Sequence, residues 1–596
     1  MRVDDQSGQA LKAWVRALER TSAVEREPAT TFPAIIERLA DRFEQSPALE
    51  SPDQTLSYRE LATLSNRYSR WAIAQGLGPG DVVCLAMHSC PDYVASWIGI
   101  TRIGATVALL NTNLRGEALA HSISIVEPKL VIVGSDLAEV LVGANASIDR
   151  MPAAWVHGPS AADLEPLGPA LARFDGDTLS VAEHVAPSID ARALLIYTSG
   201  TTGLPKAAVV SHYRVMQWSH WFAGLMNTQP ADRMYNCLPL YHSVGGIVAT
   251  GATLVGGGSV VLRTRFSATD FWKDVSAERC TLFQYIGELC RYLVNSPAHP
   301  QERNHALRLA CGNGLRPEVW AEFQRRFAIP RILEYYAATE GNFSLYNCEG
   351  EPGAIGRIPA FLGHRLPVAL VRFDVESAMP RRNADGFCER CDVDEVGEAI
   401  GFVPGPGAGR TGRFEGYVDA DASSRKLLRD VFQSGDVWYR TGDLMRRDSR
   451  GFYYFVDRVG ETFRWKGENV STGEVLAALT RCRGVVDGVV YGVAVPGADG
   501  RAGMAALVVG PEFDLVHLHA DICGRLPDYA RPVFVRLLPA LEATGTFKPK
   551  KQELINGGFD PSQVVDPIYF DDRSRQAYVR LDACLYEEIV SGRARI

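Results

Sequence analysis

The sequence has little that would direct the protein to secretion or to nucleic acid. Its first 30 residues are charged and contain no apolar stretch, so we expect no signal peptide and a cytoplasmic protein. The formal net charge is −8, and the missing basic surplus argues against a nucleic-acid partner. The twelve cysteines lie mostly inside apolar runs, which indicates reduced thiols rather than a disulfide framework.

Long apolar runs are also scarce. Residues 234–262 carry no Asp, Glu, Lys or Arg, but Pro239, His242 and three clustered glycines interrupt them. A membrane span needs about 20 apolar residues in one helix. We therefore expect a buried helix followed by a buried strand at Ser259–Leu262, with peripheral membrane contact left open.

Metal and repeat signatures are weak or missing. One Cys-x-x-Cys is present, Cys388 and Cys391, without a second Cys or His pair at zinc spacing, which favours an ordinary loop over a metal or redox site. No internal repeat is evident. A hydrophobic content of 46% over 596 residues predicts a globular protein with two to four domain-sized units.

Short apolar strands alternate with helical stretches, which is typical of α/β architecture. We predict strands at Asp81–Met87, Lys129–Val133, Ala193–Tyr197 and Arg331–Tyr335, and helices at Tyr58–Ala74 and Asp92–Ile103. A different region follows, with a hairpin over Tyr439–Arg447 and Gly451–Asp457, a strand at Glu461–Trp465, and a helix opened by Ser471 and Glu474. The α/β pattern ends near residue 557, and Pro404–Gly412 is too rich in glycine for a regular element and predicts a mobile loop.

The most informative stretch is Leu195–Lys206, an apolar strand that runs into a loop of hydroxyls and glycines. Gly200 and Gly203 let backbone N–H groups turn inward, and Lys206 supplies a positive charge. Four hydroxyl donors complete the loop: Thr198, Ser199, Thr201 and Thr202. No Gly-Lys-Ser/Thr ends it, so it is not a Walker loop. We interpret it as a polyphosphate site; the alternative is a hydroxyl-rich surface turn.

This loop resembles the phosphate loop of the adenylate-forming superfamily, whose members activate a carboxylate with ATP. The resemblance implies that residues 198–203 and Lys206 bind ATP. It also implies a large N-terminal α/β domain of several subdomains (residues 1–457), a hinge (458–460) and a small mobile C-terminal α+β domain (461–596).

The stretch Tyr335–Asn342 follows an apolar strand, and in open α/β sheets ligands bind at the carboxyl ends of strands. It resembles the fifth core motif of the superfamily. By that resemblance Tyr336 stacks on adenine, Thr339 contacts phosphate and Glu340 holds Mg²⁺, a cation that prefers oxygen ligands. The sequence Gly312-Asn313-Gly314 is similar to the adenine-side loop.

Three further residues take roles from the same resemblance. His242, in Leu238–Ser243, matches the fourth core motif and would position the acyl carboxylate; a core histidine is the alternative. Asp443 would take both ribose hydroxyls, and Arg458 would also reach the ribose.

The C-terminal part carries the remaining assignments. Thr544–Lys551 resembles the last motif, whose lysine reaches the carboxylate and α-phosphate; we assign Lys548, with Lys550 next and Lys551 as the second lysine of the family spacing. The hinge is predicted at Gly460. Lys466, Gly467 and Glu468 would form the CoA channel turn.

Several stretches are similar to one branch, the fatty acid transport proteins and very-long-chain acyl-CoA synthetases. They are Ala108–Arg115, Glu340–Asn342, Thr462–Thr472, Thr544–Lys548 and Gly558–Tyr569. The branch implies a long- or very-long-chain fatty acid-CoA ligase that uses ATP, Mg²⁺ and CoA and passes through an acyl-adenylate. Residues 234–262 and Trp218–Leu225 are the expected walls of the acyl pocket.

Three alternatives stay open. A bile acid, an aromatic acid or a carnitine-like acid would keep every motif and change only the pocket. A fatty acyl-AMP ligase serving a carrier protein would form the adenylate without CoA. A lipid carrier without catalysis is the alternative from another class. The sequence also leaves the oligomeric state open, with a homodimer among the alternatives. Any role in lipid uptake would be indirect, by trapping the acid as its CoA ester.

Overall fold

The computed structural model describes residues 3–144, 148, 150–159, 162–198, 204–374, 377–405, 407–465, 468–496, 498, 500–542 and 551–594. The chain divides into two compact units. The first comprises Met1–Leu366 and Phe402–Leu427, and the second comprises Pro367–Gly401 and Leu428–Ile596.

Two sheets organise the first unit. One has seven strands in the order β7-β6-β5-β3-β4-β8-β9, in which only the β8–β9 pair is antiparallel. Its strands are β3 (Val82–Ala86), β4 (Thr106–Leu109), β5 (Leu130–Gly134), β6 (Ala153–His157), β7 (Glu165–Pro166), β8 (Arg192–Thr198) and β9 (Lys206–Ser211). The parallel strands are continuous apolar runs because both of their faces are covered.

The second sheet of this unit runs β16-β15-β14-β13-β12-β10-β11-β1-β2, with a parallel centre from β14 to β1. Its strands are β1 (Pro47–Glu50), β2 (Thr55–Ser57), β10 (Arg233–Asn236), β11 (Ser259–Leu262), β12 (Leu282–Ile286), β13 (Leu309–Asn313), β14 (Ile332–Ala337), β15 (Ser344–Asn347) and β16 (Gly356–Arg357).

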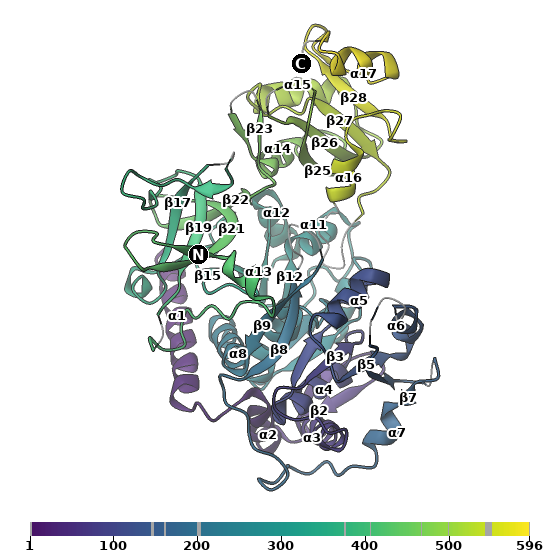
Figure 1. Ribbon diagram of the computed structural model, residues 1–596, viewed down its shortest axis with the longest axis vertical. Helices are drawn as coiled ribbons and strands as arrows, with labels where there is room; N and C mark the ends of the chain where they lie inside the picture. The colour runs from purple at the N-terminus through teal and green to yellow at the C-terminus, as the bar shows by residue number, and fades with distance from the viewer. Residues whose placement is uncertain are drawn as a thin grey trace. The chain divides into compact units, whose positions relative to one another are not determined.

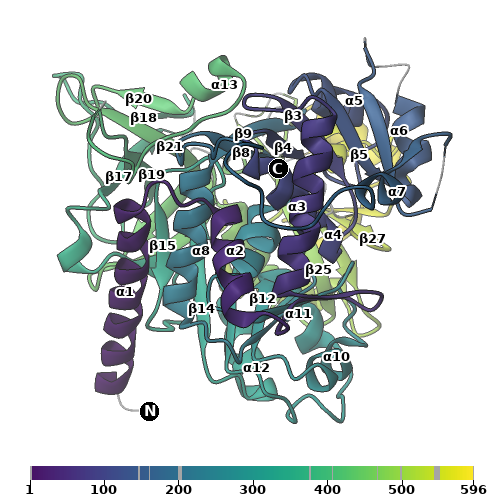
Figure 2. The ribbon, with the colours of Figure 1, turned by 90° about the horizontal axis from the view of Figure 1, so that it is seen from below.

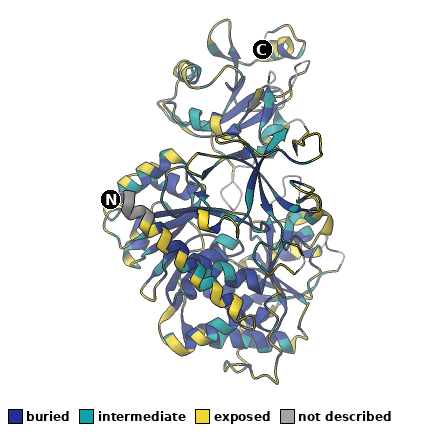
Figure 3. Ribbon diagram, turned by 90° about the vertical axis from the view of Figure 1, so that its left-hand side faces the viewer, coloured by how far each residue is buried: buried dark blue, intermediate teal, exposed yellow. Residues whose placement is uncertain are grey.

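Helices cover these sheets. They are α1 (Val3–Arg26), α2 (Phe32–Phe43), α3 (Tyr58–Ala74), α4 (Pro91–Arg102), α5 (Gly116–Ser124), α6 (Ala138–Ala144), α7 (Leu167–Leu171), α8 (His212–Met226), α9 (Thr250–Leu254), α10 (Phe271–Ala277), α11 (Gly287–Asn295), α12 (Pro317–Phe327) and α13 (Ala420–Ser424). Helix α1 lies along α8, as Figure 2 shows, and Trp14 packs edge-on against Trp221 with ring centres 5.8 Å apart. Figure 3 shows that most strand residues are buried, whereas exposed residues lie on helices and loops.

The second unit contains three sheets (Figure 1). The strands are β17 (Val368–Asp374), β18 (Met379–Pro380), β19 (Gly397–Phe402), β20 (Leu427–Arg429), β21 (Val437–Arg447), β22 (Phe452–Arg458), β23 (Phe463–Trp465), β24 (Glu468–Val470), β25 (Val485–Val493), β26 (Ala502–Val509), β27 (Phe534–Leu538), β28 (Ile568–Asp572) and β29 (Ala577–Arg580). Its helices are α14 (Thr472–Leu479), α15 (Leu515–Arg525), α16 (Lys551–Gly557) and α17 (Ala583–Val590). Strands β25 to β29 form one five-stranded sheet with its own core.

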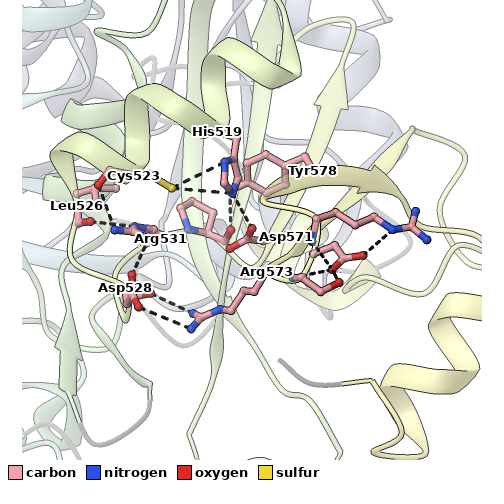
Figure 4. A network of polar contacts seen from close by, with 12 residues as sticks. His519, Cys523, Leu526, Asp528, Arg531, Asp571, Arg573 and Tyr578 are labelled. Atoms are coloured by element: carbon pink, nitrogen blue, oxygen red, sulfur yellow. Dashed lines mark hydrogen bonds and ion pairs between the residues drawn. The ribbon is translucent and has the colours of Figure 1, made fainter.

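A polar network fastens α15 to that sheet, as Figure 4 shows. The Nε2 of His519, on α15, lies 3.0 Å from Asp571 of β28. The Sγ of Cys523 lies 3.8 Å from the Nδ1 of His519. Tyr578 of β29 packs against the same ring and donates to the carbonyl of Pro532. Because both His519 and Asp571 are largely buried, their contact satisfies two polar groups at once.

The predicted mixed α/β architecture is confirmed, and the predicted strands, helices and hairpin appear within a few residues of their expected bounds. Residues 244–254 form a helix and 259–262 a buried strand, as expected. The regular pattern, however, extends past residue 557, because β28, β29 and α17 complete the last sheet. All twelve cysteines are free thiols and lie in the described parts of the chain.

Candidate active site

The predicted phosphate loop connects the two antiparallel strands β8 and β9. Thr198 ends β8 and Lys206 begins β9, and the two residues face each other in the ladder. Ser199, Gly200, Thr201, Thr202 and Gly203 lie outside the described residues. Both ends of the loop are therefore placed by one strand pair in the core of the first unit.

Tyr417 joins this strand pair to the predicted magnesium ligand. Its hydroxyl forms hydrogen bonds with Thr198 and with Glu340, and the Nζ of Lys206 lies 6.0 Å from its ring centre. Burial, followed by the negative charge of Glu340, raises the pKa of Tyr417, so the phenol stays protonated. Residues 416–418 are held against β9 by two backbone hydrogen bonds of 2.9 Å. The structure thus brings Thr198, Lys206 and Glu340 around one phenol ring.

Glu340 is 9% exposed, and its Oε1 lies 3.8 Å from the Nζ of Lys426. Among the described residues, no group of three His, Cys, Asp or Glu side chains could hold a metal by itself. Mg²⁺ normally takes one or two carboxylates and completes its shell with phosphate oxygens and water. The single carboxylate of Glu340, beside the predicted phosphate loop, is consistent with this coordination.

The fourth and fifth motifs meet beside Glu340. The hydroxyl of Ser243 lies 3.1 Å from that of Thr339. His242 precedes Ser243, and its ring packs at a tilt against that of Tyr241, with ring centres 4.6 Å apart. Tyr241 accepts a hydrogen bond from Asn113, a residue of the branch-specific stretch 108–115. A π-helical turn, Val244–Ala249, follows directly, and such turns are frequent at functional sites.

The adenine-side loop follows β13. Gly312 and Asn313 end that strand, and Gly314 has a φ of +78°, which a residue with a side chain rarely adopts. Tyr336, on the neighbouring strand β14, is half-buried, and its ring centre lies 5.9 Å from that of Phe343. The loop and this ring are therefore on adjacent strands, at the carboxyl ends where ligands bind.

Asp443 and Arg458 lie in the second unit. They face each other across the β21–β22 hairpin, with the Nε of Arg458 3.2 Å from Asp443 Oδ1. Asp443 is 6% exposed and its backbone N–H donates to Thr441. The two predicted ribose contacts therefore form one ion pair on a rigid hairpin.

The predicted hinge also belongs to the second unit. Gly460 has a φ of +88°. The next residue, Glu461, lies 2.5 Å from the Nζ of Lys551, so the second lysine of the last motif is paired beside the hinge. Glu468 begins β24, whereas Lys466, Gly467, Lys548 and Lys550 lie outside the described residues.

A cavity with a mixed polar and apolar lining begins next to Thr339 and Glu340. Ala338 and Gly341 line it, with Trp218 and Trp221 of α8 and Leu18 of α1. Its empty volume is about 1100 Å³, counting the solvent at its mouth. Two predicted wall residues, Trp218 and Trp221, are thus part of it, but no residue of 234–262 lines this cavity.

Sequence reasoning missed Tyr417, Lys426 and the link from Ser243 to Thr339. Tyr417 follows a glycine-rich segment that shows no strand pattern, and its place depends on pairing with β9 more than 200 residues away in the chain. Ser243 ends the motif Leu238–Ser243, so the sequence already placed its hydroxyl next to His242 and could have indicated a role in the site.

Comparisons with known proteins identify the family of the chain. A family model described as "AMP-binding enzyme" matches residues 36–371, and "AMP-binding enzyme C-terminal domain" matches 474–548. The chain is 40% identical to long-chain fatty acid transport protein 1 of Mus musculus over 578 residues, which cover 95% of this chain and 88% of that protein. The chain belongs to the AMP-binding enzyme family.

Within this adenylate-forming family, the chain belongs to the fatty acid transport protein and very-long-chain acyl-CoA synthetase branch. It is also 39% identical to the medium/long-chain-fatty-acid–CoA ligase FadD6 of Mycobacterium tuberculosis, over 93% of this chain and 90% of that protein. ATP-bound MatB from Rhodopseudomonas palustris has the same fold, with a TM-score of 0.73 and 22% identity over 88% of this chain and 99% of that one. The chain is therefore an enzyme, an acid–thiol ligase.

In the described part of the chain, no helix combines the length and the apolar character needed to cross a membrane.

Proposed function

We propose that this enzyme is an ATP-dependent long- or very-long-chain fatty acyl-CoA synthetase. It joins a fatty acid to AMP with release of pyrophosphate, and then transfers the acyl group to CoA with release of AMP. The observation that carries the proposal is the cluster of Thr198, Lys206 and Glu340 around Tyr417, next to a cavity that Trp218 and Trp221 help to line. The names of the relatives, fatty acid transport protein 1 and FadD6, support the choice of acid.

The first step brings two anions together, because a carboxylate attacks the α-phosphate. Lys206 and Lys548 offset that repulsion and stabilise the charge that builds on the phosphates. Loop residues 198–203 and Thr339 bind the phosphates. Glu340 would hold Mg²⁺, which would neutralise further phosphate charge.

The remaining assignments orient the substrates. Tyr336 and residues 312–314 receive adenine, and the Asp443–Arg458 pair receives the ribose. His242 positions the acid carboxylate, whose tail extends into the cavity beside Trp218 and Trp221. After adenylation the C-terminal domain turns at Gly460, and residues 466–468 line the path of CoA. The enzyme works in the cytoplasm, with peripheral contact to membranes that supply its acid.

An ATP–pyrophosphate exchange assay over carboxylic acids of graded chain length tests the proposal. We expect exchange with long-chain acids and AMP release that depends on CoA. Preference for a bile acid, an aromatic acid or a carnitine-like acid would change the assigned substrate but not the assigned reaction. Exchange without a CoA effect would favour an acyl-AMP ligase. Fatty-acid binding with neither exchange nor AMP release would favour a lipid carrier and refute the proposal.

A further inference from the structure

A buried carboxyl lies directly behind the adenine-side loop. Glu334, on β14, is 2% exposed, and its Oε1 accepts the backbone N–H of Leu315 at 3.1 Å. The backbone N–H of Gly314 donates to the same carboxyl. Its Oε2 accepts the hydroxyl of Tyr285, on β12, at 2.5 Å. Because β13 lies between β12 and β14, this one side chain connects three adjacent strands to the loop.

The loop has little space in which to take another position. A Cβ on Gly287, at the start of α11, would lie 1.8 Å from the carbonyl oxygen of Gly314. A Cβ on Gly312 would lie 2.2 Å from the carbonyl oxygen of Tyr285. The backbone of the loop therefore packs against its neighbours at distances that only glycine allows. Glu334 accepts the backbone N–H groups of Gly314 and Leu315.

We propose that Glu334 is a positioning residue for nucleotide binding, because it holds residues 313–315 in the conformation that receives adenine. The inference rests on the proposed function, which places adenine at this loop. Glu334 does not touch the nucleotide; it acts through the backbone of Gly314 and Leu315. The carboxyl is fully enclosed, so its two oxygens have no water to replace these partners.

The surroundings of Glu334 determine which form it takes. The titratable groups that interact electrostatically with it are Tyr285, Cys290, Cys311 and Tyr335, and burial raises the pKa of each. Burial also raises the pKa of Glu334 to about 8, against the opposing hydrogen bonds of Tyr285, Leu315 and Gly314. One carboxyl oxygen accepts from the loop, and the other accepts the hydroxyl of Tyr285. Glutamine keeps an oxygen as the acceptor for the loop, and alanine removes it.

Calorimetric titration of ATP into the full chain, without acid or CoA, tests this role. We expect Glu334→Ala to weaken ATP binding by roughly tenfold or more, the usual effect of leaving buried N–H groups without an acceptor. Glu334→Gln should stay within about threefold of the wild type by the same estimate. Tyr235→Phe is the matched control, since it removes a buried hydroxyl from the nearby strand β10 without touching the loop. The KM for the fatty acid should not change in any of these variants.

The pH dependence separates positioning from a general structural role. Wild-type ATP affinity should change as the pH rises from 7 to 9, because the carboxyl that holds the loop ionises in that range, whereas Glu334→Gln should show a flat profile. Equal ATP affinity of Glu334→Ala and wild type would overturn the inference. If Glu334→Ala does not fold, identical pH profiles of wild type and Glu334→Gln would overturn it. Wild-type protein that binds no ATP would instead refute the proposed function.

Discussion

At the scale of single residues, the site depends on hydroxyls that connect its charged groups. Tyr417 is the clearest case, since its phenol joins Thr198 to Glu340. We expect Tyr417→Phe to lower kcat/KM in ATP–pyrophosphate exchange by roughly tenfold to a hundredfold, because a hydrogen bond to a charged group contributes about 1.5–3 kcal/mol. Tyr578→Phe, which removes a buried hydroxyl bonded to Pro532, should leave exchange unchanged. Equal rates for Tyr417→Phe and wild type would show that the phenol does not organise the site.

A second residue-scale prediction concerns stability. Burial raises the pKa of Glu334 to about 8, whereas the unfolded chain ionises near the ordinary value of 4.5. Between these values the folded state holds a proton that the unfolded chain releases, so stability falls as the pH rises. The loss reaches at most about 5 kcal/mol at pH 8. Glu334→Gln should therefore show a smaller drop in melting temperature between pH 5 and pH 8; parallel drops would contradict this.

At the scale of elements, two buried histidines of α8 make the stability of the fold sensitive to acid. Burial lowers the pKa of His212 and of His220 to about 4, and the charge of Arg20 adds to the effect at His220. The unfolded chain takes up these protons near pH 6.5, so their stabilisation is present above that pH and is lost as the pH falls towards 4. Each contributes about 3 kcal/mol. His220→Gln should reduce the loss of melting temperature between pH 7 and pH 5, while the exposed His517→Gln should not.

The elements also show how far sequence reasoning reaches. Thr198, Lys206 and Glu340 could be predicted because each stands in a local motif at the end of a strand. Tyr417 could not, because its position results from pairing between β9 and a segment far along the chain. Glu334 was hidden in a strand that reads as apolar, and its role depends on two neighbouring strands. Local chemistry is visible in a sequence, whereas contacts made by tertiary pairing are not.

At the scale of the whole molecule, Pro367–Gly401 and Leu428–Ile596 form one compact unit. The domain boundary at 457–460 stays a prediction. The hinge at Gly460 concerns movement and stays a prediction. Asp457 is relevant to this predicted movement. Its carboxylate accepts the backbone N–H of Thr472 at 2.6 Å and so connects β22 to α14 across the predicted hinge.

The domain-alternation model predicts that the two half-reactions separate. Lys548→Ala should abolish formation of the acyl-adenylate, because one cation no longer reaches the phosphates, with a loss on the order of 10²–10³ or more. Thioester formation from supplied acyl-adenylate and CoA should be retained. The two rates can be measured by pyrophosphate exchange and by CoA-thiol consumption. Lys551→Ala is the matched control from the same basic run; equal losses in both half-reactions of Lys548→Ala would contradict alternation.

The cysteines allow the predicted movement of the C-terminal domain to be measured by site-specific labelling. Of the twelve, only Cys584, on α17, is exposed; Cys90, Cys391 and Cys523 are partly covered and the other eight are buried. A maleimide spin label or fluorophore at low stoichiometry would therefore enter the C-terminal sheet region first, without a cysteine-free background. Paired with a second probe on the nucleotide, it would report in real time whether that region swings when pyrophosphate leaves.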